Sequence, residues 1–285
     1  MKTITVTSKN INDRDFKKRS AKESDYSTLI KEPCIIKVGD EVKIIYDELD
    51  IDCLEVLNAV RKIKYTVNIR SHGLKTISRI FGFKPRQPQR GDFCTASTLA
   101  REFPKENAIV AEFAEKIEKS YEKYHPEGFK FHKESIKEIL PEYKIGKTVF
   151  TSGIINKNNP LKYHYDTGNY NKVYSCMLVM KGGTEGGYLS IPDYDIGIEL
   201  KNNSILMFDG QSIMHGVTPI RYTSPFGYRY SIVYYSLKRL WKCLTIDDEL
   251  IRVRTKKMER EKRRHNMTPE YKKYLESLAF KEHNL

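Results

Sequence analysis

Apolar and polar positions follow two different rhythms along this chain. Between Pro104 and Tyr124 apolar residues recur every three or four positions, which predicts an amphipathic helix. From about Tyr143 onward, short apolar runs are separated by Gly, Asn, Asp and Pro, a pattern typical of strands joined by turns. The runs expected as strands are residues 147–156, 161–165, 173–180, 187–192, 196–200, 204–208, 213–220 and 228–237.

The order of these elements favours an α+β fold. A succession of short strands is typical of a sandwich or a jelly roll, and helices that precede the strands argue against a parallel α/β sheet. We therefore expect a jelly-roll core, with its supporting helix, over residues 96–242.

The first 95 residues are expected to be an accessory region packed on that core. Residues 1–30 are polar, and we predict that they lack stable structure. A hairpin is predicted over residues 34–49 and a helix over residues 52–64. Residues 71–95 are rich in Gly, Pro and Arg, and we predict that they form loop.

Size and composition restrict the class of protein. The chain has 285 residues, 39% of them hydrophobic and 31% charged, which suits a globular protein with a sizeable core. No run approaches the roughly 20 apolar residues of a membrane helix, and the N-terminus has no apolar signal core. The five cysteines form no CxxC pair, so we expect neither structural zinc nor a disulfide framework. A location in the reducing cytoplasm, without secretion, follows from these features.

The net charge of +13 favours polyanionic partners, although charge also serves solubility. Residues 252–264 concentrate it, with eight Lys or Arg against two Glu. We predict that residues 243–285 form a basic helical extension, broken near Pro269. It either tracks phosphates or is a solvated helix without a ligand. The candidate phosphate-binding residues are Lys256, Lys257, Arg260, Arg263 and Arg264.

A His-x-Asp motif lies at the end of one predicted strand. In an extended chain, residues two apart face the same side, so His164 and Asp166 can aim at one metal ion. His215 follows 49 residues later. Two His and one carboxylate form the facial triad of non-haem Fe(II) oxygenases, which leaves positions open for other ligands. Either motif alone is weak evidence, because a satisfied surface His is the commoner explanation.

The ordered set of motifs around this triad strengthens the metal hypothesis. GGYLSIP begins at Gly186, SILMFDG begins at Ser204, and Arg229 lies 14 residues after His215 inside a predicted strand. Arg can hold a carboxylate through two hydrogen bonds, and Ser231 on the same strand face adds another donor. A buried Arg in an apolar strand needs a partner, and the sequence places no acid beside it. The alternative is an edge-strand Arg that faces water.

This ordered set resembles the double-stranded β-helix dioxygenases that use 2-oxoglutarate, over about residues 145–240. The resemblance implies that 2-oxoglutarate and molecular oxygen are converted to succinate and CO2, with an oxidant that abstracts hydrogen from the substrate. Ascorbate is the reductant expected in vitro. By this resemblance the Fe(II) ligands are His164, Asp166 and His215, and the residues that bind the distal carboxylate of 2-oxoglutarate are Arg229 and Ser231.

Within that superfamily, HYDTGNYN, GGYLSIPDY and MHGVTPI resemble the TET/J-binding-protein branch, which oxidises the methyl group of 5-methylcytosine or thymine in DNA. The segment FGFKPRQPQRGDFCTASTLAREFP resembles small phage and bacterial members, which extends the likeness to about residues 80–240. The resemblance implies a bacterial or phage-infected cell and DNA with a methylated pyrimidine as partner, without an obligate protein partner. It also implies base contacts from Asn169 and Tyr235, and a further 2-oxoglutarate contact from Arg90, with Arg86 the next candidate.

Departures from the branch leave the identity of the base open. Two residues after Tyr235 stands Leu237, where animal TET enzymes have a His that reads cytosine, and their Cys- and His-rich zinc region is absent. We favour 5-methylcytosine as target, with thymine in DNA as the alternative. Asn169 can also be an ordinary turn residue, Tyr235 a core residue and Arg90 a surface residue. A prolyl-type protein hydroxylase, and a nucleic-acid-binding jelly roll without metal chemistry, also stay open.

Overall fold

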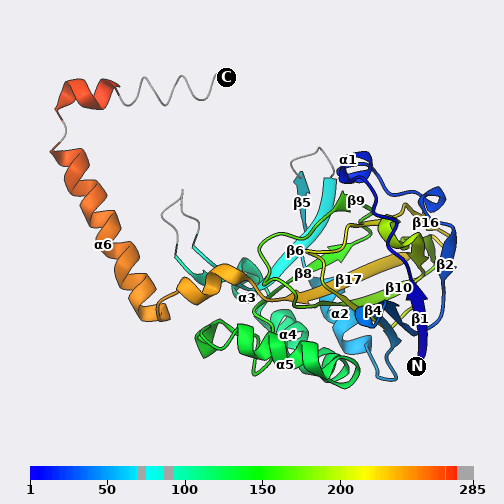
Figure 1. Ribbon diagram of the computed structural model, residues 1–285. Helices are drawn as coiled ribbons and strands as arrows, with labels where there is room; N and C mark the ends of the chain where they lie inside the picture. The colour runs from blue at the N-terminus through cyan, green and yellow to red at the C-terminus, as the bar shows by residue number, and fades with distance from the viewer. Residues whose placement is uncertain (70–74, 87–92, 267, 275–285) are drawn as a thin grey trace.

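Two β-sheets and a layer of helices make up the computed structural model of the chain, which describes residues 1–69, 75–86, 93–266 and 268–274 (Figure 1). Helices α2 (Leu54–Lys62), α4 (Pro104–Tyr124) and α5 (Pro126–Ser135) lie together on one side of the larger sheet. The smaller sheet packs on its other face. This arrangement confirms the predicted α+β class. Within the described ranges, no helix combines the length and the apolar content needed to cross a bilayer.

The larger sheet combines strands from distant parts of the chain. In spatial order it consists of β1 (Lys2–Val6), β3 (Cys34–Val38), β4 (Glu41–Glu48), β14 (Ser204–Phe208), β10 (Ser175–Gly182), β17 (Tyr228–Tyr235), β8 (Ser152–Lys157), β6 (Lys75–Lys84) and β5 (Thr66–Ile69), with β7 (Thr95–Ala96) paired to β6. Strands from the first 95 residues are thus hydrogen-bonded into the same sheet as those of the expected core.

The smaller sheet has the order β2 (Thr28–Ile30), β13 (Ile196–Ile198), β12 (Leu189–Ile191), β15 (His215–Val217) and β9 (Leu161–His164). Strands β11 (Thr184–Gly186) and β16 (Ile220–Tyr222) pair with each other in a separate two-stranded sheet. Three further α-helices in the described ranges are α1 (Asp13–Phe16), α3 (Thr98–Glu102) and α6 (Ile246–His265).

Strand β10 shows how alternation along a strand separates the two cores. Cys176, Leu178 and Met180 are buried in the cluster that includes the helices. Met177 and Val179 are buried in the cluster shared with the smaller sheet. Because successive side chains of a strand point to opposite faces, a strand buried on both sides is apolar throughout.

Helix α4 occupies the predicted residues and packs as its periodicity predicts. Pro104 stands at its first turn, where a missing N–H costs nothing. Val110, Phe113 and Ile117 are buried at helical spacing against the larger sheet. Tyr121 completes the stripe, and its ring lies flat on that of Tyr174 with a centroid separation of 5.8 Å. The helix therefore anchors the sheet from the side opposite the smaller sheet.

Two expectations for the front of the chain are wrong. Residues 1–30 are not unstructured, because β1 pairs in parallel with β3 and β2 pairs in parallel with β13. Backbone pairing holds these segments, so their polar side chains can stay exposed. Residues 75–84 are not loop but strand β6, which alternates buried and exposed positions and pairs with β8. The Gly, Pro and Arg residues of the surrounding window obscured that alternation. The predicted hairpin over residues 34–49 is confirmed.

A disulfide joins Cys94 to Cys243, with a Cα–Cα distance of 5.9 Å. We expected no disulfide framework, and this one pair departs from that expectation. The two residues are separated by 149 positions, so their spacing in the sequence carries no sign of the contact. Cys34, Cys53 and Cys176 are buried free thiols.

Helix α6 projects from the body (Figure 1). Its first turn is anchored by Glu249, whose fully buried carboxylate accepts hydrogen bonds from the backbone N–H groups of Cys94 and Leu244 and from Arg86. Beyond this turn most side chains are exposed. Helical structure resumes at Pro269 after the helix ends at His265.

Candidate active site

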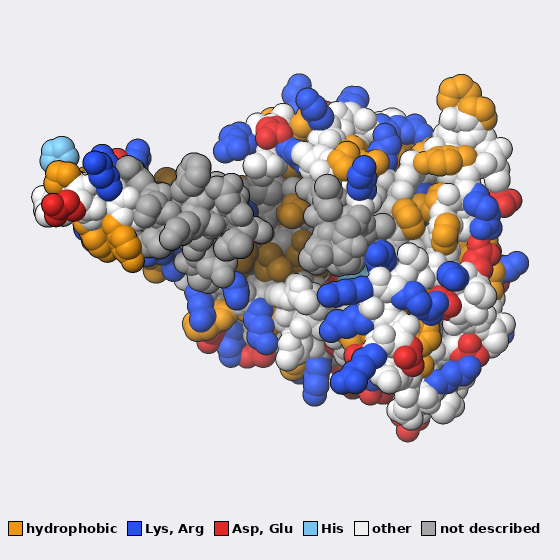
Figure 2. Space-filling model, turned by 90° about the horizontal axis from the view of Figure 1, so that it is seen from above, with side chains coloured by type: hydrophobic (Ala, Val, Ile, Leu, Met, Phe, Trp, Pro, Cys, Tyr) orange, Lys and Arg blue, Asp and Glu red, His pale blue; other side chains and the backbone are white. Residues whose placement is uncertain are grey.

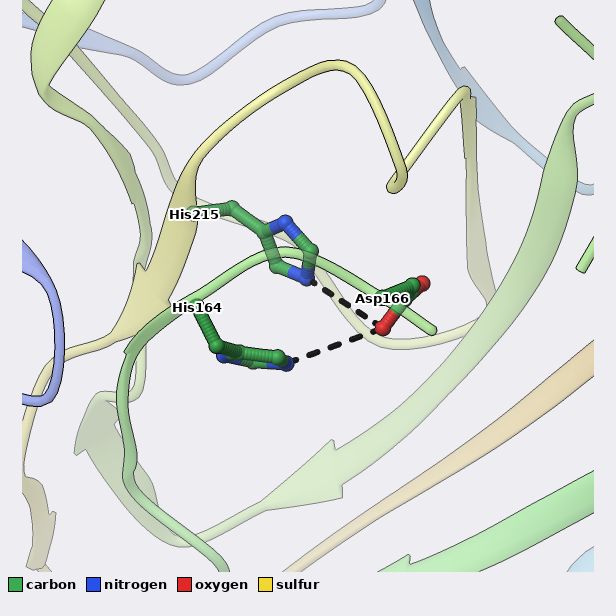
Figure 3. Close-up of side chains that lie close together, drawn as sticks. All are labelled: His164, Asp166 and His215. Carbon is green, nitrogen blue, oxygen red and sulfur yellow. Dashed lines mark ion pairs between the residues drawn. The ribbon is translucent and has the colours of Figure 1, made fainter. Parts of the chain in front are cut away.

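The predicted metal ligands lie together between strands β9 and β15. His164 ends β9, His215 begins β15, and the two residues are directly opposite in the antiparallel pair. The Asp166 Oδ1 atom lies 3.6 Å from His164 Nε2 and 3.9 Å from His215 Nε2 (Figure 3). One potential ligand atom from each residue falls within 4.8 Å of the other two. The fold therefore brings an HxD motif and a distant His to one point.

Backbone carbonyls orient both imidazole rings. His164 Nδ1 lies 2.8 Å from the Lys162 carbonyl oxygen, and His215 Nδ1 lies 2.9 Å from the Ile213 carbonyl oxygen. A carbonyl only accepts, so each Nδ1 carries the proton and donates it. Nε2, the nitrogen of each ring that faces Asp166, is thereby left as the atom available to a divalent metal ion.

Two glycines of the sequence motifs make room for functional side chains. A Cβ on Gly210 would lie 2.2 Å from Asp166 Oδ2. The Gly210 carbonyl also accepts a 2.8 Å hydrogen bond from the Asp166 N–H. Gly187 has a φ of +63°, and a Cβ there would lie 2.9 Å from Arg229 Nε. Gly210, the last residue of SILMFDG, and Gly187, the second residue of GGYLSIP, thus occupy positions without room for a side chain.

A cavity of about 590 Å³ opens between the two sheets. The sheet register explains which residues of the larger sheet face it. Ser231 and Val233 lie on one face of β17, opposite Asn156 and Ile154 of β8, and all four line the cavity. The cavity gathers the three candidate metal ligands and four further predicted residues. Those four are Asn169, Arg229, Ser231 and Tyr235.

Arg229 is a buried cation, and the described residues place no acidic counter-ion beside it. Its side chain is only 3% exposed, and its Nη2 has no hydrogen-bond partner in the described part of the chain. Burial lowers the pKa of the guanidinium to about 10, so it stays charged at neutral pH. The alternative of an Arg facing water is therefore wrong. An unpaired buried cation that lines a cavity is suited to an anionic ligand.

Residues 86–238, more than half of the chain, match the Tet_JBP family, described as the oxygenase domain of the 2OGFeDO superfamily. The chain belongs to this family. It is 33% identical over 97 residues to the bifunctional helicase and thymine dioxygenase JBP2 of Trypanosoma brucei brucei. These 97 residues are 34% of this chain and 9% of that protein. JBP2 of Leishmania braziliensis is 27% identical over 135 residues, 47% of this chain and 12% of that protein. The chain thus spans about a tenth of the length of these relatives.

The structure of NgTET1 in complex with 5mC DNA has a similar fold. It superimposes with a TM-score of 0.57 and 16% identity, over 83% of this chain and 86% of NgTET1. The residues of this Tet/JBP oxygenase fit the groups that its superfamily uses. Three converging donor atoms suit Fe(II), and the unpaired Arg229 guanidinium suits a carboxylate of 2-oxoglutarate.

Two cavity residues of this Tet/JBP oxygenase were missed in the sequence. Asn156 Nδ2 donates to Ser231 Oγ at 3.4 Å, and Asn159 Nδ2 donates to Asn156 Oδ1 at 3.2 Å. Asn159 also bonds to both backbone groups of Ile77, which fixes it to β6. The available signal was Asn156 itself, a polar residue within an apolar strand. Together these amides hold the Ser231 hydroxyl in place.

The expected base-contacting residues, Asn169 and Tyr235, both line the cavity. Asn169 is buried, and its Nδ2 donates to Ser175 Oγ at 3.2 Å. An isolated bridge pairs its backbone with Leu237, two residues beyond the half-buried Tyr235. All four residues line the cavity. Tyr235 is therefore not simply a core residue.

The other predicted residues lie elsewhere. Arg86, the second candidate for 2-oxoglutarate, donates a 2.6 Å hydrogen bond to Glu249 and is not among the residues that line the cavity. Arg90 falls outside the described residues. The candidate phosphate-binding residues of α6 are all exposed, and two of them form ion pairs along the helix, Lys257 with Glu261 and Arg263 with Glu259.

Proposed function

We propose that the chain is an Fe(II)- and 2-oxoglutarate-dependent dioxygenase that hydroxylates the methyl group of a modified pyrimidine in DNA, with 5-methylcytosine converted to 5-hydroxymethylcytosine. The observation that carries the proposal is the unpaired, buried Arg229 in the same cavity as the converging His, Asp and His. We also infer that the two stacked sheets form a double-stranded β-helix.

His164 Nε2, His215 Nε2 and the Asp166 carboxylate would hold Fe(II), which when bound supplies oxygen activation and cleavage of the substrate C–H bond. Arg229 would bind the distal carboxylate of 2-oxoglutarate through its guanidinium, and Ser231 would donate a hydrogen bond to it. That carboxylate supplies the counter-ion that the guanidinium lacks. Apolar side chains also line the cavity and would help to exclude water; they include Leu161, Met177, Leu189, Phe208 and Val217.

A methyl group on a duplex base reaches this cavity only if the base is extruded, at a cost of a few kcal/mol. We propose that Tyr235 stacks on the extruded base, a contact worth about 1–3 kcal/mol, and that Asn169 hydrogen-bonds its edge. Thymine is the alternative target. The named relatives support both bases, because JBP2 is a thymine dioxygenase and NgTET1 is in complex with 5mC DNA.

The exposed basic residues of α6 would bind phosphates of the same DNA. Lys and Arg side chains are also spread over the face of the body seen in Figure 2, and further ones lie along the projecting arm. A positive surface attracts DNA irrespective of sequence, and the attraction weakens with salt. The candidate residues are Lys256, Lys257, Arg260, Arg263 and Arg264.

The test is turnover on defined DNA. Purified protein is loaded anaerobically with Fe(II), 2-oxoglutarate and ascorbate, mixed with methylated or unmethylated duplex, and exposed to oxygen; nucleosides are then measured by mass spectrometry. We expect 5-hydroxymethylcytosine from the methylated duplex. 5-Hydroxymethyluracil from both duplexes would assign thymine instead. Succinate release with a peptide, and no modified nucleoside, would replace the proposal with the protein-hydroxylase alternative.

A further inference from the structure

Strand β9, which carries His164, is an edge strand of the smaller sheet. It has four residues, and its pairing with β15 is irregular, with a register shift between the partners of His215 and Val217. A short strand held from one side opens easily. The position of His164 therefore depends on what covers the outer edge of β9.

Residues 18–20 cover that edge. The Lys18 N–H donates to the Tyr163 carbonyl and the Tyr163 N–H donates to the Arg19 carbonyl, both at 2.9 Å. Ser20 lies opposite Lys162 in an antiparallel bridge. Both backbone groups of Tyr163, the residue before His164, are thus bound by the N-terminal segment.

A buried polar network reinforces the backbone contacts. The fully buried Tyr163 hydroxyl donates to Asp25 Oδ2 at 2.9 Å, and Ser190 Oγ lies 2.6 Å from it. Asp25 Oδ1 accepts from Arg19 Nη1 at 2.9 Å. The Arg19 guanidinium also lies over the rings of Phe16 and Tyr163, at 4.8 and 5.5 Å. Charged hydrogen bonds and cation–π contacts that share members support one another.

A small apolar cluster links the same segment to the second histidine. Ala21, Tyr163 and Met214 are buried together, and Phe16 packs against them. Tyr163 and Met214 immediately precede His164 and His215 in the sequence. On the other side of His164, the Tyr165 hydroxyl donates to Asp13 Oδ1 at 2.8 Å. One N-terminal segment therefore contacts the neighbours of both histidines.

We propose that residues 13–25 form a brace that fixes the two histidines in the geometry that binds iron. This rests on the iron site proposed above. Tyr163 and Asp25 act as positioning residues, since they hold the backbone beside the ligands and touch no ligand atom themselves. The brace lies before the matched family region, residues 86–238, and so extends the oxygenase domain with a segment of its own.

Hydrogen exchange of the metal-free, full-length chain tests the mechanical part of this proposal. In Tyr163→Phe and Asp25→Ala we expect backbone amides of residues 161–166 to exchange at least tenfold faster, with unchanged rates in β14. Ser27→Ala is the control, because Ser27 lies two residues from Asp25 but its hydroxyl donates to Asp195. Unchanged exchange at residues 161–166 in both variants overturns the brace.

Titration with Co(II), followed by its visible absorption, tests the effect on the metal site. Loss of supporting contacts around metal ligands typically weakens binding by about 10- to 100-fold, so we expect the Co(II) Kd to rise about tenfold in both variants and to stay unchanged in Ser27→Ala. Faster exchange with an unchanged Kd would overturn the proposed role toward the metal. A wild-type chain that binds no Co(II) would overturn the iron site itself, whereas the exchange result would still decide whether the segment holds β9. If Asp25→Ala fails to fold, Tyr163→Phe decides.

Discussion

Replacing Arg229 should affect folding and cosubstrate binding in opposite directions. The guanidinium is buried without an acidic partner among the described residues, and burial lowers its pKa from 12.5 to about 10. Each pKa unit corresponds to about 1.4 kcal/mol, so keeping this group charged costs the folded state about 3 kcal/mol. Because the folded pKa is lowered, the penalty is fully present at neutral pH. Arg229→Met removes this penalty. The free energy of unfolding of the ligand-free variant should therefore be higher than that of the wild type.

The same substitution should weaken 2-oxoglutarate binding. Losing a charged hydrogen bond costs about 1.5–3 kcal/mol, which corresponds to roughly 10- to 150-fold in affinity. Arg229→Lys should restore only part of this, because an ammonium lacks the bidentate fork. Arg221→Met is a matched control, since Arg221 is exposed and pairs with Glu23, and it should change neither quantity.

Urea denaturation without ligands gives the stability, and the rise in Tm with Mn(II) and 2-oxoglutarate under anaerobic conditions gives the binding. We expect Arg229→Met to combine a higher urea midpoint with a lost 2-oxoglutarate-dependent rise in Tm. A ligand-free variant less stable than the wild type would refute the argument from the unpaired charge. If Arg229→Met and Arg229→Lys both kept the 2-oxoglutarate-dependent rise in Tm of the wild type, the proposed role of Arg229 in binding would be refuted.

Four further outcomes are expected. Ala at any one of the three proposed iron ligands should abolish turnover and leave the circular dichroism spectrum unchanged. Gly210→Ala should have a similar effect on turnover, because its Cβ would meet the Asp166 carboxylate; wild-type Co(II) affinity would contradict this. Replacing the five candidate residues of α6 with Gln should weaken binding to all DNA sequences alike and flatten the dependence of affinity on salt. An unchanged salt dependence would show that α6 is only a solvated helix. Burial lowers the pKa of His132 to about 3, so the free energy of unfolding should fall as the pH drops below about 6.5, by about 2 kcal/mol at pH 5. Urea denaturation of His132→Gln should no longer show this loss.

The site was predictable where its residues are set by local geometry. His164 and Asp166 are only two positions apart, although Asp166 lies just beyond the end of β9. Arg229 and Ser231 share one face of β17, so strand alternation alone places that pair. The contacts that could not be predicted from the sequence depend on backbone pairing between residues far apart in the chain. Asn156 supports Ser231 only because β8 lies beside β17 in a particular register. The partner of Arg86 could not be predicted, because Glu249 lies 163 residues away.

The distribution of the site over two sheets explains why the N-terminal region matters to it. The candidate iron ligands His164 and His215 belong to the smaller sheet, whereas Arg229 and Ser231 belong to the larger sheet. The distance between the candidate iron ligands and Arg229 is therefore set by how the sheets stack. Residues 2–48 supply β1, β3 and β4 to the larger sheet and β2 to the smaller one. A single N-terminal stretch thus ties together the two halves between which the cavity forms. Within this stretch, the proposed brace contacts β9, the strand that carries His164.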